Sequence, residues 1–160
     1  MGRKWCTVIL LTPHFELEEF ERTGTRLVNV APQIVVVRLK LLCAAILEPL
    51  RERTGPLRIT SGYRSAQVNE AVGSKSKNSQ HLTGQACDCV PLKMKSEQAF
   101  EILYDMSEHG LPVDQAILYP KKGHIHISFN ADEEPRRQFM IHSKGKYKKY
   151  RRLDNGRDHT

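Results

Sequence analysis

The chain has 160 residues, of which 39% are apolar and 27% charged, and its formal net charge is +7. This length favours a single domain that buries a hydrophobic core without disulfide bonds. The sequence has no apolar run of the roughly 18–20 residues that a membrane-spanning helix needs, and we expect no signal peptide, because the apolar run of residues 8–11 is too short for one. A thiolate zinc finger is not expected, because no CxxC pair occurs among Cys6, Cys43, Cys87 and Cys89.

Helices are expected in the first third of the chain. A turn from Thr12 leads into a short helix that ends near Gly24, and a longer helix begins at Pro32, since proline is favoured in the first helical turn. Apolar residues at spacings of three and four predict the buried face of this longer helix: Ile34, Val37, Leu41, Ala44, Ala45 and Leu47. Pro49 is expected to kink it and Gly55 to end it. The β-branched run from Ile34 to Val37 leaves a strand open for that part.

Strands alternate with helices in the rest of the chain. The predicted strands are residues 57–60, 85–90, 115–119 and 124–129. A hairpin turn over residues 120–123 joins the last two. Ser65 and Ser96 are expected to cap two helices, which end near Gly73 and Gly110. The pattern predicts an α+β fold, in which helices pack on a small, mostly antiparallel sheet.

Four residues with metal-binding side chains lie on or beside the predicted strands: His81, Asp88, His124 and His126. His124 and His126 are two residues apart on one strand, so their side chains point to the same face. The same alternation sends Cys87 and Cys89 to the face opposite Asp88, where we expect them to pack in the core. Catalytic zinc sites have three nitrogen or oxygen ligands and one open position. Taken alone, however, an HxH pair is more often two strand histidines than a metal site.

Three segments together carry a family resemblance: Ser61-Gly-Tyr-Arg-Ser65, Ser79-Gln-His-Leu-Thr-Gly-Gln-Ala-Cys-Asp88 and His124-Ile-His-Ile-Ser128. They resemble the M15 zinc peptidases, which include D-Ala-D-Ala carboxypeptidases and phage endolysins and share a fold with the signalling domain of hedgehog proteins. The family pattern SxHxxGxAxD is met at Ser79, His81, Gly84, Ala86 and Asp88. The resemblance covers roughly Leu11 to Gln138 and implies a hedgehog/DD-peptidase-like fold.

The resemblance also assigns roles to single residues. It makes three residues the zinc ligands: His81, Asp88 and His126. Arg64 matches the family arginine that faces the substrate, where a guanidinium binds a peptide carboxylate or stabilises an oxyanion. The alternative for Arg64 is a structural ion pair with an acid such as Glu70. Ser79 and Tyr63 are expected to bind substrate, although Ser79 equally suits a role in shaping the loop before His81.

The sequence departs from the family at the general base. M15 enzymes carry a Glu or Asp shortly before the last zinc histidine, but the two usual spacings place Pro120 and Gly123 there. His124 is one replacement, because imidazole titrates near physiological pH and this one neighbours a metal ligand. An acid from elsewhere is a second, with three candidates: Asp114, Asp132 and Glu133. The third reading is a domain that binds zinc and cell-wall peptide without cutting.

The sequence therefore predicts a zinc metallopeptidase that hydrolyses peptidoglycan stem peptides, as a carboxypeptidase or as an endopeptidase. In this mechanism Arg64 steadies the substrate or the oxyanion, and His124 carries the proton. Zinc is the expected cofactor. The alternative function is a non-catalytic zinc-binding module that recognises the cell wall.

The positive charge is concentrated at the C-terminus. Residues 141–160 hold seven Lys/Arg and two Asp, which is five of the seven net charges. We expect a peptidase domain over residues 1–140 and a basic tail over residues 141–160. The tail either is a solvated, disordered end or binds an anionic cell-wall polymer, while a near-neutral body with one Trp argues against nucleic acid. The protein is expected to be a monomer that stays in the cytoplasm until release, or that a phage delivers to the cell wall.

Overall fold

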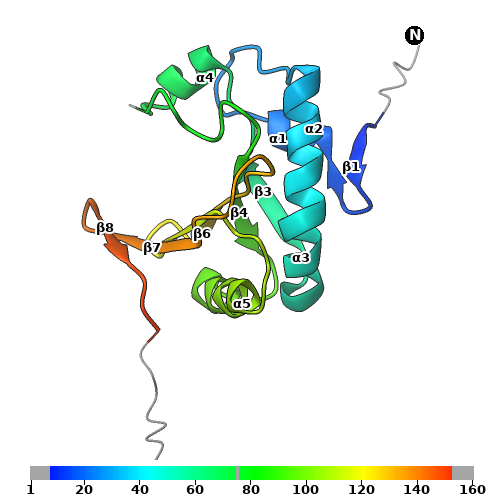
Figure 1. Cartoon of the computed structure of the whole chain (residues 1–160). Coiled ribbons are helices and arrows are strands. Elements are labelled where there is room, and N and C mark those ends of the chain that lie inside the picture. The colour runs from blue at the N-terminus through cyan, green and yellow to red at the C-terminus, as the bar shows by residue number, and fades with distance from the viewer. Residues whose placement is uncertain (1–7, 75, 153–160) are drawn as a thin grey trace, which may run out of the picture.

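The computed structural model describes residues 8–74 and 76–152 (Figure 1), so Cys6 lies outside the described residues. The chain begins with a small antiparallel sheet of two strands, β1 (Leu10–Thr12) and β2 (Phe15–Glu16). Helix α1 (Leu17–Glu21) follows at once, and the side chain of Glu19 accepts a hydrogen bond from the N–H of Glu16 (2.9 Å) at its start. The short helix was predicted. The two strands were not, because segments of two or three residues carry no readable alternation.

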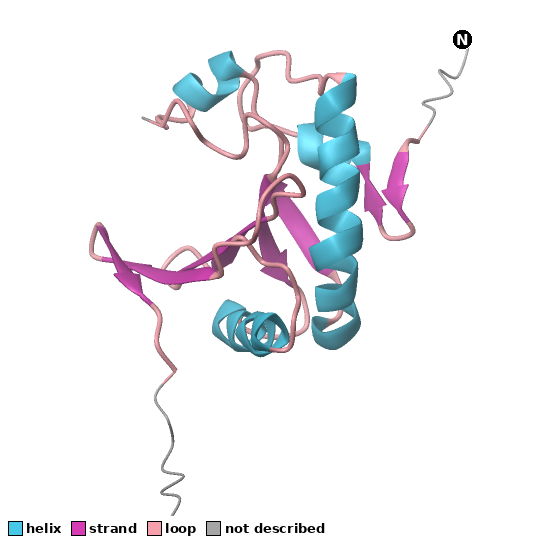
Figure 2. Cartoon of the chain, viewed as in Figure 1, coloured by secondary structure: helices cyan, strands magenta, loops and turns pink. Residues whose placement is uncertain are grey.

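The long helix, drawn as one run in Figure 2, has three consecutive segments: α2 (Gln33–Leu42), the π-helical η1 (Cys43–Leu47) and α3 (Glu48–Thr54). The π-turn lies directly before Pro49, whose ring would clash with the carbonyl of residue 45 in a regular α-helix. The N–H of Glu48 instead donates to the carbonyl of Cys43, five residues back. The predicted helix is thus confirmed over the strand alternative, and the irregularity at Pro49 is a π-turn.

The buried face of this helix differs from the predicted one. Ile34, Val37 and Leu41 are 41–59% exposed, and of the predicted face only Leu47 is fully buried. The buried apolar residues are Val35, Leu39, Leu42, Cys43, Ile46, Leu47 and Leu50. Both sets recur at helical spacings, because α2 is apolar on nearly all sides. Spacing alone therefore predicted the helix correctly and its orientation wrongly.

The main sheet has six strands in the order β3-β4-β6-β5-β7-β8. Their bounds are β3 (Leu57–Ser61), β4 (Ala86–Pro91), β5 (Gln115–Tyr119), β6 (His124–Ser128), β7 (Gln138–Ser143) and β8 (Lys146–Lys149). Neighbouring strands are antiparallel except for β5 and β7, which are parallel. The predicted α+β fold is confirmed, and each of the four predicted strands is present with its ends displaced by at most one residue.

Two further helices flank the sheet, α4 (Ala66–Ala71) and α5 (Ser96–Glu108). In Figure 1, α4 lies at the top of the view and α5 at the bottom. Ser65 caps α4 as predicted, because its hydroxyl accepts a hydrogen bond from the N–H of Val68 (3.3 Å). Ser96 is not the cap of α5. Lys95 takes that position, and its N–H donates to the side chain of Gln98 (3.1 Å).

The hydrophobic core lies between the sheet, the long helix and α5. Its largest fully buried side chains include Phe15, Phe20, Phe100, Leu39, Ile46, Ile125 and Ile127. None of the helices within residues 8–74 and 76–152 combines the length and the apolar character needed to cross a membrane.

The C-terminal strands β7 and β8 form a hairpin at the edge of the main sheet. The ring of Phe139 packs edge-on against Phe100 and Tyr104 of α5, with centroids 5.6 and 5.1 Å away. Residues 153–160 of the basic segment lie outside the described residues. The division into a domain of residues 1–140 and a tail of residues 141–160 stays a prediction, and strand β7 crosses that boundary.

Candidate metal centre

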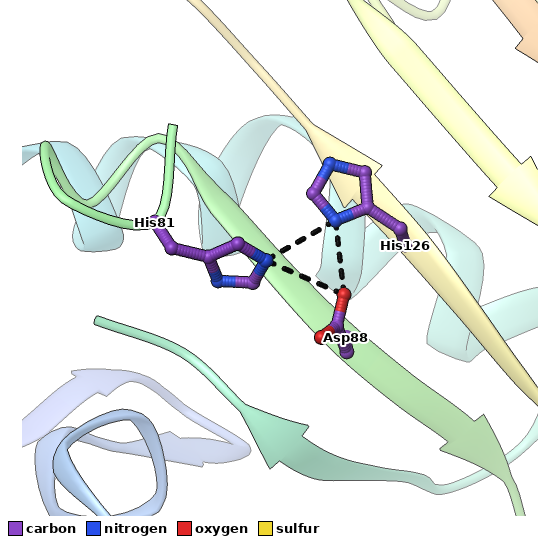
Figure 3. Close-up of side chains that lie close together, drawn as sticks. All are labelled: His81, Asp88 and His126. Atoms are coloured by element: carbon purple, nitrogen blue, oxygen red, sulfur yellow. Dashed lines mark hydrogen bonds and ion pairs between the residues drawn. The ribbon is translucent and has the colours of Figure 1, made fainter. Parts of the chain in front are cut away.

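The three predicted metal ligands converge from three parts of the chain (Figure 3). Asp88 lies on β4 and His126 on β6, and the two residues are direct partners in the antiparallel pairing of these strands. Their side chains therefore stand side by side on one face of the sheet. His81 belongs to the loop before β4, and its ring points at the other two (Figure 3).

The donor atoms are close enough for one metal ion. Nδ1 of His126 is 2.9 Å from Oδ1 of Asp88, and Nε2 of His81 is 3.4 Å from that oxygen and 3.2 Å from Nδ1 of His126. With bonds of about 2.0–2.1 Å in a tetrahedral zinc site, neighbouring donors lie about 3.3 Å apart. Two imidazoles and one carboxylate are also a typical donor set for catalytic zinc. Spacing and chemistry therefore fit a zinc-sized ion.

A backbone carbonyl orients His81. Nδ1 of His81 lies 2.7 Å from the carbonyl oxygen of Gly62, and the ring is only 4% exposed. A carbonyl only accepts hydrogen bonds, so Nδ1 carries the proton and Nε2 offers its lone pair to the metal. Gly62 has no room for a side chain, because a Cβ there would lie 2.5 Å from Cα of Phe20. Glycine at residue 62 therefore lets the chain pack directly on Phe20 while its carbonyl contacts His81.

Asp88 is held between Arg64 and the histidines. Nη2 of Arg64 donates to Oδ2 of Asp88 (2.9 Å), and Nε of Arg64 donates to Oγ of Ser61 (2.9 Å). Burial alone raises the pKa of Asp88, but the hydrogen bonds and charges of His126 and His81 outweigh it and hold this pKa well below its usual value. The carboxylate is therefore ionised, as a metal ligand must be. Among the ion pairs of the described residues, that of Arg64 is with Asp88 and not with Glu70.

The two cysteines beside Asp88 face away from the metal centre. Cys87 and Cys89 are fully buried among core residues. The hydrogen bond to Cys89 and burial raise the pKa of the Cys87 thiol well above its usual value. A protonated thiol is a poor metal ligand, so the prediction that these cysteines pack in the core is confirmed.

The metal centre opens into a cleft of about 1010 Å³. One wall includes residues 72–74, 76 and 78–81, and side chains from strands β4 to β8 form the floor. Arg64, Ser79 and His124 line this cleft, as their predicted roles require. Tyr63 does not line it, because its side chain is 8% exposed and packs in the core. The cleft thus gathers every predicted site residue except Tyr63.

His124 lies beside the metal centre and stacks on Tyr119. The centroids of the two rings are 4.6 Å apart and the rings are inclined by 29°. Burial lowers the pKa of His124, and the negative charge of Asp88 offsets this only in part. A neutral imidazole has one nitrogen that accepts a proton, so this side chain has the chemistry of a base and lies in the cleft.

The three acids considered as a replacement base lie in different settings. Asp114 lines the cleft, but Arg136 occupies both of its oxygens, with Nε at 2.9 Å and Nη2 at 2.6 Å. Burial raises the pKa of Asp114, but the Arg136 contacts outweigh it and hold this pKa far below its usual value. Asp132 is exposed and pairs with Arg38 (3.6 Å). Glu133 is exposed and lines the cleft.

An ion pair between the buried Asp114 and the exposed Arg136 connects the loop of His81 to strand β6. Asp114 also accepts hydrogen bonds from Nε2 of Gln80 (2.8 Å) and Oγ of Ser128 (3.3 Å). Gln80 directly precedes His81, and Ser128 belongs to the strand that carries the second histidine ligand. Arg136 also donates to the side chain of Gln80 (3.1 Å). Only one sequence signal points to this network, an acid directly before a predicted strand, because the partners of Asp114 lie far away along the chain.

The chain matches one family of known proteins. A family model described as Peptidase M15 matches residues 13–128, which include the three residues that could hold a metal ion and most of the residues that line the cleft. M15 peptidases are generally metal-dependent, in agreement with the His-Asp-His group. No curated protein matches the chain. The family model spans more than half of the chain, and the protein therefore belongs to the peptidase M15 family.

Proposed function

We propose that the protein is a zinc peptidase that hydrolyses the stem peptides of peptidoglycan. The observation that carries this proposal is the convergence of His81, Asp88 and His126 in a large cleft, in a chain of the peptidase M15 family. These three residues would hold the zinc ion, which would supply Lewis-acid chemistry for activating water and polarising the carbonyl of the bond that is cut.

Arg64 binds and orients the substrate in this proposal. Two of its N–H groups are used by Asp88 and Ser61. A guanidinium has five N–H groups in a planar fork, so others remain for a ligand in the cleft that Arg64 lines. They suit a peptide carboxylate, or the carbonyl oxygen that becomes negative during hydrolysis. The contact with Asp88 holds the guanidinium in place beside the reacting bond.

His124 carries the proton in the proposed reaction. The positions that hold an acid in the family are occupied by Pro120 and Gly123, which have no group that accepts a proton. The imidazole of His124 takes a proton from the attacking water and returns it to the leaving amine. Its stacking on Tyr119 fixes the plane in which its nitrogens lie.

A second candidate function is a zinc-binding module that recognises cell-wall peptide without cutting it. The observation that favours it is the same pair of residues, Pro120 and Gly123, in place of an acid. General acid–base catalysis typically contributes about 10²–10⁴-fold, so its weakening leaves room for slow hydrolysis as well. Turnover by the zinc-loaded protein separates the two functions.

Digestion of purified peptidoglycan, followed by mass analysis of the released fragments, tests the proposal. The zinc-loaded wild type is expected to release peptide fragments, and His81→Ala is expected to release none. The matched control is His109→Ala, because His109 is an exposed histidine on the C-terminal end of α5, where its Nδ1 contacts the carbonyl of Asp105 (2.7 Å). This variant is expected to release the same fragments as the wild type. A zinc-loaded wild type that releases nothing would favour the binding module.

A further inference from the structure

A row of four aromatic side chains runs across the main sheet, one each from β6, β5, β7 and β8: His124, Tyr119, His142 and Tyr147. Tyr119 is the strand partner of His124, and His142 is the strand partner of Tyr147. The ring centroids are 4.6 Å apart for the first pair, 5.1 Å for Tyr119 and His142, and 4.8 Å for the last pair. The four rings therefore form one continuous contact chain.

The row and the metal centre lie on the same face of the sheet. His124 and His126 are two residues apart on β6, which places their side chains on one face. All four rings line the cleft that contains His81, Asp88 and His126. The cleft thus continues beyond the metal centre onto β7 and β8, which reach the outer edge of the molecule (Figure 1).

The opposite face of the hairpin anchors this row. Phe139 of β7 is buried against Phe100 and Tyr104, and its carbonyl accepts a hydrogen bond from the N–H of Tyr150 (2.8 Å). The ring of Tyr150 also packs edge-on against Phe100, with centroids 5.2 Å apart. Both ends of the hairpin are therefore packed on α5, and His142 and Tyr147 lie on the face that lines the cleft.

The row presents polar atoms to the cleft. Tyr119 lies on the strand between β6 and β7, and the rings of His124 and His142 are inclined to it by only 29° and 35°. Tyr119 thus has an aromatic neighbour on each adjacent strand, and its hydroxyl is a polar group of the cleft. The hydroxyls of Tyr119 and Tyr147 lie 3.3 Å apart. Such a surface suits a ligand with hydrogen-bond acceptors better than it suits a flat apolar ligand.

One lysine lies at the row, and further basic residues follow it in the chain. Nζ of Lys122 lies 5.6 Å from the ring centroid of Tyr119, and Lys122 lines the cleft. Residues 144–152 contain six Lys/Arg and no acid. Within the part of the chain that the structure describes, only Arg152 among these six is in an ion pair, with Asp105. The remaining positive charges attract an anionic ligand to this end of the cleft.

We propose that the aromatic row and Lys122 form a second binding region of the cleft, which holds a carboxylate-bearing residue of the peptide away from the bond that is cut. Phenolic hydroxyls and an ammonium group donate hydrogen bonds, and a carboxylate only accepts them. This inference rests on the proposed function, because it takes the ligand to be a peptide substrate. It makes the protein selective for acidic stem peptides over amidated ones.

Calorimetric titration of two matched stem peptides into the zinc-loaded full chain tests this selectivity. One peptide keeps the free carboxylates along its length and the other has them amidated, while both keep the C-terminal carboxylate. The test variants are Lys122→Gln and Tyr147→Phe, and Tyr147 is 54% exposed, so loss of its hydroxyl leaves the core intact. The control is Lys148→Gln, which removes the same charge from a β8 position that faces away from the cleft.

The acidic peptide is expected to bind the wild type about 10-fold more tightly than the amidated one. Lys122→Gln and Tyr147→Phe should each remove most of this difference, and Lys148→Gln should retain it. Equal binding of the two peptides, no binding of either, or equal losses in Lys148→Gln and Lys122→Gln would overturn the inference. The titration measures binding and does not depend on hydrolysis. Selective binding with neither peptide cleaved would therefore support the second binding region and count only against the proposed hydrolysis.

Discussion

Gly62 links the packing of the fold to the metal centre at the scale of a single residue. Gly62→Ala forces the backbone away from Phe20, because the new Cβ would lie 2.5 Å from its Cα. Overpacking of this kind lowers the free energy of unfolding by about 3 kcal/mol. The displaced carbonyl also releases Nδ1 of His81, and such a loss weakens metal binding by about 10–100-fold. Denaturant unfolding and zinc titration measure the two effects.

Gly24→Ala is the matched control, because nothing lies within 4 Å of a Cβ at that position. We expect it to change the free energy of unfolding by no more than about 0.5 kcal/mol and to leave zinc affinity unchanged. Equal effects of the two substitutions would show that the contact between Gly62 and His81 does not orient the ligand.

His124 is the residue on which the proposed proton transfer depends. His124→Ala is expected to lower kcat by about 100-fold or more, because the proton then has no acceptor beside the reacting bond. Zinc content is expected to stay at the wild-type level, since the ligand group is His81, Asp88 and His126. Kinetics and metal analysis on the same samples separate these effects. An unchanged kcat would show that another group, such as Glu133, accepts the proton.

The three candidate metal ligands could be predicted from the sequence, but the contacts that orient them could not. The motif around His81 and Asp88, together with the HxH pair, indicated the three residues that the structure brings together. The carbonyl of Gly62 carries no side-chain signal, so no sequence pattern could show that it orients His81. The contact of Arg64 with Asp88 was missed for a related reason, because it depends on how β3 and β4 are paired.

At the scale of structural elements, the Asp114–Arg136 ion pair joins the loop of His81 to the sheet. Asp114→Asn removes the charge from a buried carboxylate that Arg136, Gln80 and Ser128 all contact. The buried side chain at position 114 then loses its charge-assisted hydrogen bonds, and because the Arg136 side chain is 53% exposed and screened by solvent, we expect a loss of about 1–2 kcal/mol in the free energy of unfolding. Denaturant unfolding at neutral pH measures this loss. A variant as stable as the wild type would contradict it.

The same carboxylate predicts a pH dependence of stability. Its pKa in the folded state is held far below the usual value, mainly by Arg136 acting against burial. The ion pair therefore stabilises the fold above the unfolded pKa of about 3.9, and this contribution is lost as the pH falls towards the folded value. The difference in Tm between wild type and Asp114→Asn should be large at pH 7 and shrink below about pH 4. A constant difference would show that ionisation of Asp114 is not its source.

Helices and strands with a clear periodicity of apolar residues were predicted, and those without such a periodicity were not. The long helix was recognised, but its apolar residues on nearly all sides left its orientation open, and Ile34, Val37 and Leu41 proved exposed. The hairpin of β7 and β8 was hidden because lysine-rich segments are typical of solvated ends. Lysines also suit an edge strand, where their charge prevents pairing with another chain. The packing of Phe139 and Tyr150 on α5 distinguishes the two cases.

At the scale of the whole molecule, the two faces of the six-stranded sheet have different roles: one forms the core and the other lines the cleft. One face packs on α5 and the long helix and forms the core. The other holds Asp88 and His126, and it continues through the aromatic row to the basic hairpin at the edge. The order of the strands therefore joins the metal centre and the positively charged end in one cleft.

The central claim is that His81, Asp88 and His126 hold one zinc ion and that this ion makes the protein a peptidase. The most direct measurement removes the metal with a chelator, verifies the fold by circular dichroism, and returns zinc stepwise while released peptidoglycan fragments are quantified. We predict that fragment release rises in proportion to zinc up to one equivalent per chain and then levels off. We predict no rise for His81→Ala at any zinc concentration. Fragment release that persists without metal, or that returns equally in His81→Ala, would contradict the claim.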